Sequence, residues 1–233
     1  MLATLSVKIA AVFFWSFQLA PQAYTNWKAQ STEGLSSIMV LCWTLGSLAT
    51  AIYCIGFNVG GVESPIFIAQ PNLFMLFSII CWSQCIVHSY QSYTIGIASG
   101  VGLLVISLII EVVGGYYMLQ NPTKSSKIVL GCLTLIFFAI GYIPQFKQIY
   151  DERRVSGLSL IFLAFDMLGA ALSIVSLAID DSNFNPITAS GYIVVLVCDM
   201  GIVLLYWLLP IAFERVKSSE ETVEVVSSVV ETV

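Results

Sequence analysis

Seven long runs of apolar residues follow one another along the chain, with short polar segments between them. A helix that spans a bilayer needs about 20 mostly apolar residues, and each run has about that length. Backbone inside hydrocarbon must satisfy its own hydrogen bonds, so each run is predicted to be helical. The predicted helices cover residues 5–25, 35–57, 66–90, 93–118, 128–150, 158–179 and 187–213. The pattern therefore predicts an all-α membrane protein with seven transmembrane helices.

The segment after the last run has a different character. Residues 214–233 hold five glutamates and two bases, which give −3 of the net charge of −5. This segment is rich in Ser, Glu and Val and has no apolar periodicity long enough to fold alone. We expect residues 1–213 to form a single transmembrane domain and residues 214–233 to form a flexible acidic tail.

Composition agrees with a membrane protein and excludes several other classes. Of all residues, 58% are hydrophobic and 10% are charged, whereas soluble domains carry roughly 45–50% apolar and about 25% charged residues. No basic stripe points to nucleic acid. With one histidine, no glycine-rich phosphate loop and no metal-ligand spacing, the chain is not predicted to be an enzyme or to hold a cofactor or metal. The six cysteines lie in apolar runs, where thiols act as small fillers.

Basic residues near the helix ends predict the orientation, because cytosolic loops are enriched in Lys and Arg. The loops after helices one, three and five share a side with the C-terminus. That side carries six bases, and the opposite side carries three. The two sets are Lys28, Lys147, Arg153, Arg154, Arg215 and Lys217, against Lys8, Lys124 and Lys127. The C-terminus is thus predicted to be cytosolic and the N-terminus lumenal or extracellular.

The chain contains an internal repeat with an offset of 123 positions. Residues 14–46 align without a gap over residues 137–169, and nine of the 33 pairs are identical. Chance would give roughly three identities, so the match indicates a true repeat. An internal repeat of this kind reveals the architecture of a chain. The identical pairs are Phe14/Phe137, Pro21/Pro144, Gln22/Gln145, Gly34/Gly157, Leu35/Leu158, Ser36/Ser159, Ile38/Ile161, Leu45/Leu168 and Gly46/Gly169.

The offset of four spans gives both copies the same orientation in the membrane. Repeat 1 covers about residues 5–90 and repeat 2 about residues 128–213, with an inverting linker helix at 93–118. Two parallel three-helix bundles are therefore predicted. Parallel repeats related by an axis along the membrane normal are a known transporter plan, with the substrate site between the halves.

The residues shared by the two copies resemble the motif of the PQ-loop family. They are Pro21-Gln22 followed by Gly34-Leu35-Ser36, and Pro144-Gln145 followed by Gly157-Leu158-Ser159. This family includes cystinosin and the lysosomal and vacuolar basic amino acid exporters. The SWEET sugar transporters and the KDEL receptor are more distantly similar. The resemblance implies a seven-helix carrier of a small solute.

Proline inside a helix removes one hydrogen bond and crowds the carbonyl four residues earlier. Pro21 frees the carbonyl of Phe17, and Pro144 frees that of Ile140, so a kink is expected in each copy. The adjacent glutamines, Gln22 and Gln145, can bond freed backbone groups or the facing bundle. The pair of kinks is interpreted as a paired hinge, as the resemblance implies; static kinks capped by the glutamines are the alternative.

Three acids lie within the apolar runs, where ionisable groups are costly and often mark a pathway. They are Asp166, Asp199 and Glu111, and no base lies at a similar depth. Burial without a base favours the protonated form of a carboxyl group, so each is a candidate proton or substrate site. The alternative is a neutral acid that donates one hydrogen bond between helices. Phe165-Asp166 and Cys198-Asp199 resemble positions of cystinosin, and this resemblance implies proton coupling; Glu111 has no such counterpart.

Several other polar or aromatic residues are candidates for lining a cavity. Gln70 and Asn72 flank Pro71 in the third helix, and Trp43 in the second could stack on a substrate or simply pack. In the basic amino acid exporters a W-x-x-G-D pattern places an acid after this tryptophan, whereas here Gly46-Ser47 follows Trp43. The substrate of that subgroup is therefore not transferred to this chain.

The leading hypothesis is a transporter that exports an amino acid or a derivative, together with protons, from an acidic organelle such as the vacuole or lysosome. Its partners would be the small-molecule substrate, protons and the lipid bilayer; the oligomeric state is not predicted. Two alternatives stay open. One is a facilitator that needs no proton, like the SWEET branch, and the other is a non-transporting receptor or scaffold, like the KDEL receptor.

Overall fold

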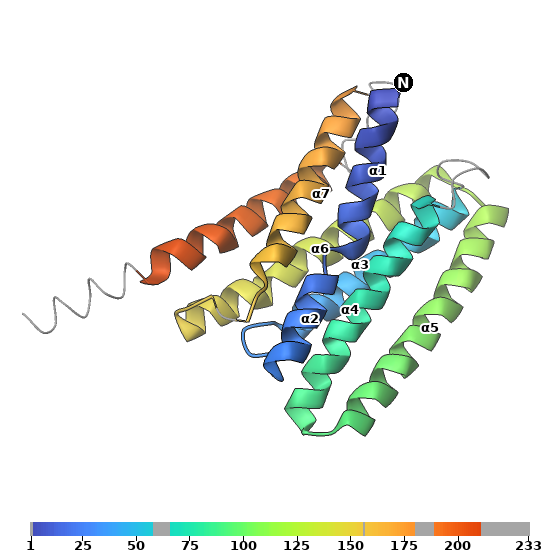
Figure 1. Ribbon diagram of the computed structural model, residues 1–233. Coiled ribbons are helices and arrows are strands. Elements are labelled where there is room, and N and C mark those ends of the chain that lie inside the picture. The colour runs from blue at the N-terminus through green and yellow to red at the C-terminus, as the bar shows by residue number, and fades with distance from the viewer. Residues whose placement is uncertain (1, 58–65, 156, 180–188, 211–233) are drawn as a thin grey trace, which may run out of the picture.

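A computed structural model describes residues 2–57, 66–155, 157–179 and 189–210 of the chain (Figure 1). These residues form long helices joined by short connections. The predicted loops 60–65 and 180–186 and the tail 214–233 lie outside the described residues. The helices are α1 (Leu2–Phe17), α2 (Ala20–Ala29), α3 (Ser37–Gly56), α4 (Ile66–Tyr90), α5 (Tyr93–Gln120), α6 (Lys124–Glu152), α7 (Leu160–Ile179) and a last helix, Ala189–Pro210.

Six of these helices are long and apolar enough to cross a membrane, namely α3 to α7 and the last helix. The first predicted crossing is supplied by α1 and α2 together. The predicted turn at Gln91-Ser92 is confirmed between α4 and α5, where Ser92 caps α5 by accepting a bond from Ile95 N. The chain is thus a seven-helix, all-α membrane protein, as predicted.

The first crossing is broken, although the sequence predicts one helix over residues 5–25. Helix α1 ends at Phe17, and α2 begins at Ala20, after two intervening residues, with Pro21 in its first turn. Proline has no N–H to donate to the Phe17 carbonyl, which interrupts the ladder. A new ladder starts where Ala23 N donates to Leu19 O over 2.9 Å.

The second copy of the motif responds differently. Pro144 lies inside α6, and this helix continues to Glu152. The two halves therefore differ at the prolines that the repeat makes equivalent. Near Pro21 the first half is broken into two helices, α1 and α2. Near Pro144 the second half keeps one continuous helix, α6.

The structure shows that the repeat extends over all three helices of each half. Adding 123 to the bounds of α3, Ser37–Gly56, gives the bounds of α7, Leu160–Ile179. The same shift carries α4, Ile66–Tyr90, onto residues 189–213, which overlap the last helix, Ala189–Pro210. Each half is therefore a copy of one three-helix unit.

The halves meet along two equivalent seams. Helix α1 packs against α7, and α6 packs against α3 (Figure 1). The shift of 123 exchanges these two pairs, as a two-fold axis between the halves requires. The linker helix α5 packs against α3 and α4, on the first half.

Aromatic rings on glycine hold the two seams together. A Cβ atom at Gly169 of α7 would lie 2.8 Å from Trp15 Cδ1, and one at Gly46 of α3 would lie 3.2 Å from the Phe138 ring. The repeat makes Trp15 equivalent to Phe138 and Gly46 equivalent to Gly169. Small residues let helices approach closely within a membrane. The same contact thus closes both seams.

Candidate functional site

The motif glutamine of the first half binds the loop of the second half. Gln22 is fully buried, and its Nε2 donates to Gly157 O over 2.7 Å. Its Oε1 accepts from Ser159 N, also over 2.7 Å. The amide therefore satisfies one carbonyl and one N–H of the connection between α6 and α7.

The second half returns the same contact. Gln145 is also fully buried; its Nε2 donates to Gly34 O and its Oε1 accepts from Ser36 N, each over 2.8 Å. Gln145, Gly34 and Ser36 are the residues that the repeat makes equivalent to Gln22, Gly157 and Ser159. We call these six residues the crossed clamp. Each half closes on the other half through backbone groups that would otherwise be buried without partners.

The two loops of the crossed clamp touch at their glycines. Gly34 and Gly157 have φ values of 86° and 71°, which disfavour residues with a side chain. A Cβ atom at Gly157 would overlap the carbonyl oxygen of Glu33 and lie 3.3 Å from Gly34 Cα. Glycine is therefore required here both by the backbone conformation and by the contact. The bundle is closed at this end.

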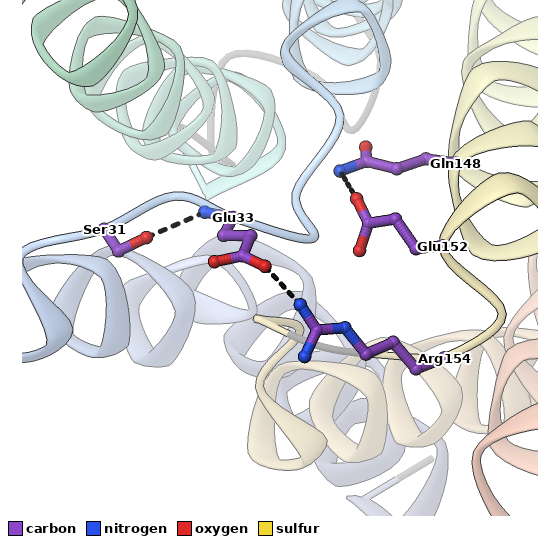
Figure 2. Close-up of polar contacts among 5 residues, drawn as sticks. All are labelled: Ser31, Glu33, Gln148, Glu152 and Arg154. Carbon is purple, nitrogen blue, oxygen red and sulfur yellow. Dashed lines mark hydrogen bonds and ion pairs between the residues drawn. The ribbon is translucent and has the colours of Figure 1, made fainter. Parts of the chain in front are cut away.

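Polar contacts on the surface reinforce the same end (Figure 2). Arg154 forms an ion pair with Glu33 of the opposite half, and Ser31 Oγ accepts from Glu33 N over 3.1 Å. On α6, Gln148 Nε2 donates to Glu152 Oε1 over 2.8 Å. The Arg154 and Glu33 side chains are 62% and 64% exposed, so this ion pair is solvated and weak.

Replacing Gln145 with leucine is expected to destabilise the protein far more than replacing Arg154 with alanine. The first change leaves two buried backbone groups without their bonds, at about 1–3 kcal/mol each, whereas an exposed ion pair contributes less than about 1 kcal/mol. Thermal unfolding in detergent, followed by size-exclusion fluorescence, measures both. Equal melting temperatures for the two variants would show that the crossed clamp does not stabilise this arrangement.

The acids predicted in the last two crossings come together with a tyrosine. Tyr142 Oη of α6 donates to Asp199 Oδ1 of the last helix over 2.9 Å. The Asp166 carboxyl of α7 lies close to both of these groups. All three side chains are at most 2% exposed. We call these residues the acid pair and its tyrosine.

Two carboxyl groups this close to each other cannot both ionise at low cost. One oxygen of each acid, Asp166 Oδ1 and Asp199 Oδ2, is buried with no hydrogen-bond partner. Among the described residues, no group of three or more His, Cys, Asp or Glu side chains could hold a metal ion. The acid pair is therefore suited to holding a proton and to accepting bonds from a ligand.

Two further buried polar atoms lack partners: Trp15 Nε1 on α1, and Gln18 Oε1 in the connection that follows α1. Trp15 packs on Gly169, one turn along α7 from Asp166. Buried polar atoms are nearly always bonded, so each exception in a native fold needs an explanation such as a ligand or water. The unpartnered atoms of Trp15 and Asp166 belong to the same α1–α7 seam.

Sequence reasoning did not select Tyr142, Gln18 or Trp15 for the site. A signal was present, because Tyr142 and Gln18 stand two and three residues before the prolines Pro144 and Pro21. Polar residues this close to a helix proline are candidates for the region that the proline distorts. The spacing to the motif nominates Tyr142 and Gln18, whereas it does not nominate Trp15.

The acid pair belongs to one side of the two-fold axis only. The repeat makes Asp166 equivalent to Trp43, and Gln18 equivalent to Gly141. Trp43 is 1% exposed, its ring packs on Gly141, and its Nε1 donates to Phe138 O over 3.3 Å. An indole thus fills the α3–α6 seam at the position where the α1–α7 seam carries a carboxyl group. The chemistry is asymmetric although the scaffold is not.

Glu111 lies away from the acid pair. It is 4% exposed on the linker helix α5, and its Oε1 accepts from Asn72 Nδ2 of α4 over 2.7 Å. Asn72 also donates to Ile68 O over 2.9 Å, and Gln70 is half-buried nearby on the same helix. Glu111 and Asn72 therefore join the linker helix to the first half. The structure does not bring them to the seam between the halves.

The fold and the site together define a class: a membrane protein built of two parallel three-helix repeats that are joined by a linker helix and clamped by paired glutamines. The PQ-loop repeat model matches residues 6–60 and 128–185, the two copies of the motif region. Both halves of the chain therefore carry the PQ-loop repeat.

Relatives in other organisms agree with this assignment. The chain is 27% identical over 198 residues to an uncharacterized protein of Schizosaccharomyces pombe, covering 82% of this chain and 67% of that protein. An uncharacterized membrane protein of Saccharomyces cerevisiae is 30% identical over 210 residues, covering 86% of this chain and 64% of that protein. Cystinosin of Bos taurus is 23% identical over 187 residues, covering 72% of this chain and 50% of cystinosin. The family and the similarity to cystinosin support a membrane transporter in general, rather than an enzyme.

Proposed function

We propose that this protein is a proton-coupled carrier that moves an amino acid or a derivative from an acidic organelle to the cytosol. The observation that carries the proposal is the acid pair and its tyrosine, buried between helices of the second half. Asp166 and Asp199 share a proton in the closed arrangement. Ionisation of the pair is favoured when water from the cytosolic side reaches it, so release of the proton is linked to opening on that side.

The unpartnered atoms support an amine-bearing substrate. Gln18 Oε1, Asp166 Oδ1 and Asp199 Oδ2 are acceptors, and an ammonium group presents three N–H donors. Trp15 Nε1 is a donor and suits a carboxylate oxygen. Buried acceptors of this kind discriminate strongly against solutes that lack the matching donor.

The crossed clamp supplies a gate at one end of the bundle. Gln22 and Gln145 hold the loops at Gly157 and Gly34 together, so this end is closed in the structure. A hollow of about 540 Å³ lies beside the clamp and is lined largely by hydroxyl and amide side chains. The end of the bundle that holds the crossed clamp lies on the predicted cytosolic side. Release of the clamp would connect the α1–α7 seam with the hollow.

The location is part of the same proposal. A proton gradient that drives export requires an acidic lumen, as in the vacuole or lysosome, and the similarity to cystinosin supports an endomembrane. The distribution of bases supports a lumenal N-terminus and a cytosolic C-terminus.

A receptor or scaffold is the second candidate, and one observation favours it. The centre between the halves is filled by packed aromatic rings, with Trp43 in contact with Phe74, Tyr142 and Phe162. Aromatic packing of this density contributes to stability and leaves no evident passage in the closed arrangement.

Uptake into proteoliposomes separates these functions. Purified protein is reconstituted, and a panel of radiolabelled amino acids and sugars is offered with and without an imposed proton gradient. Accumulation that needs the gradient and is abolished by a protonophore is the expected result. Uptake that is indifferent to the gradient would favour a facilitator, and no uptake of any solute would favour the receptor or scaffold.

A further inference from the structure

A groove of about 390 Å³ runs along the outer side of the first half, between α2, α4 and α5. It lies apart from the acid pair, which is formed by α6, α7 and the last helix. Several of its lining side chains are apolar and exposed, among them Leu76, Ile80, Ile97 and Val101. The helices that form it cross the membrane, so lipid surrounds this side of the protein. Its volume is within the range of ligand sites, roughly 300–1,000 Å³.

The groove is polar at one end only. Gln30, His88 and Tyr93 line it where α4 ends, and Tyr93 Oη donates to Gln30 Oε1 over 3.1 Å. At its other end lies Leu76, twelve residues before His88 on α4, which corresponds to about 18 Å along the helix. The hydrocarbon core is about 30 Å thick. The groove therefore extends from one membrane interface to about the middle of the bilayer.

Its wall is stiff and closely packed. Gly96 and Gly100 of α5 lie against Val87 and Ser83 of α4, so closely that a Cβ atom at either glycine would overlap those side chains. Ile97 and Val101, in the same helix, are β-branched and have restricted rotamers. A stiff, branched wall suits a rigid ring system better than a flexible chain.

We propose that this groove binds a sterol, with the hydroxyl group at Gln30, His88 and Tyr93 and the rings along α4 and α5. A single hydroxyl both donates and accepts, which matches the mixed donors and acceptors of these side chains. Among the described lining residues there is no lysine or arginine to pair with a phosphate. A phospholipid headgroup therefore lacks the permanently charged partner that its phosphate prefers. The length of the groove also limits the occupant to one leaflet.

The floor of the groove is connected to the crossed clamp by hydrogen bonds. Gln84 and Asn26 line the groove, and Asn26 Nδ2 donates to Gln84 Oε1 over 2.9 Å. Gln84 Nε2 donates to Ala23 O over 3.0 Å, and Gln22 Nε2 donates to Asn26 Oδ1 over 2.8 Å. A sterol that holds α2 against α4 therefore stabilises the position of Gln22, and with it the clamped arrangement.

The test uses the full chain in phosphatidylcholine nanodiscs that contain a photoreactive cholesterol analogue. Peptide mapping is expected to place the label on the lining residues of α4 and α5. Val101→Trp fills the groove and is expected to lower this labelling by about tenfold. A tenfold loss of affinity corresponds to losing contacts with about two methylene groups. Ile109→Trp is the matched control, because Ile109 is 58% exposed on the same helix, as Val101 is at 56%, and it does not line the groove.

Melting temperature is the second measurement, and it also tests whether the variants are folded. Cholesterol in the nanodisc is expected to raise the melting temperature of the wild type and of Ile109→Trp, but not that of Val101→Trp. Equal labelling of both variants would overturn the proposal. So would a photoreactive phosphatidylcholine that labels the groove without competition from cholesterol.

Discussion

Gly157→Ala is expected to lower the free energy of unfolding of this protein by about 3–8 kcal/mol. The backbone at this residue has φ of 71°, which costs a residue with a side chain about 1–2 kcal/mol. The added Cβ also overlaps Glu33 O, so the loops must separate. Separation removes the bonds of Gln22 to Gly157 and Ser159, at about 1–3 kcal/mol for each buried group left unpaired.

Gly102→Ala is the matched control for this prediction. Gly102 lies on α5, and a Cβ atom there meets no heavy atom within 4 Å. Alanine favours a helix over glycine by about 1 kcal/mol, so this variant is expected to match or exceed the wild-type melting temperature. A Gly157→Ala protein that melts with the wild type would show that the loops do not need their close contact.

Much of the fold could be predicted, because membrane helices are governed by length and apolarity. The range 66–90 predicted for the third crossing matches α4, and the repeat in the sequence became a repeat of whole helices. The break at Pro21 could not be predicted. Pro144 has the same motif and lies in a continuous helix, so the Pro-Gln motif alone does not decide between a broken and a continuous helix.

The site was predicted in parts but not as a whole. The sequence suggested Asp166 and Asp199 singly, from their depth, and the glutamines as bonding partners for freed backbone or the facing bundle. Gln22 binds a carbonyl 135 positions away in the chain, and no spacing rule reaches that far. The pairing of the acids through Tyr142 depends on how α6, α7 and the last helix cross. That geometry is set by packing rather than by periodicity.

Asp166→Asn is expected to abolish gradient-driven accumulation while leaving solute exchange across the membrane largely intact. The amide has nearly the shape of the protonated acid but cannot release a proton, so the pair no longer cycles between its two charge states. In the wild type, accumulation is expected to rise as the side that supplies the substrate is made more acidic, because protonation loads the pair there. The variant is expected to lose that pH dependence. Proteoliposomes loaded with unlabelled substrate measure exchange, and an imposed proton gradient measures accumulation.

Glu111→Gln makes the same chemical change at the acid that lies outside the seam. Because Glu111 bonds Asn72 between the linker helix and the first half, this variant is expected to retain the pH dependence of accumulation. Its melting temperature should change little, since glutamine keeps an oxygen that accepts from Asn72. If Glu111→Gln loses coupling and Asp166→Asn keeps it, the proton pathway runs through the linker helix. The acid pair would then be a structural contact between α7 and the last helix, and the proposed coupling through Asp166 would be wrong.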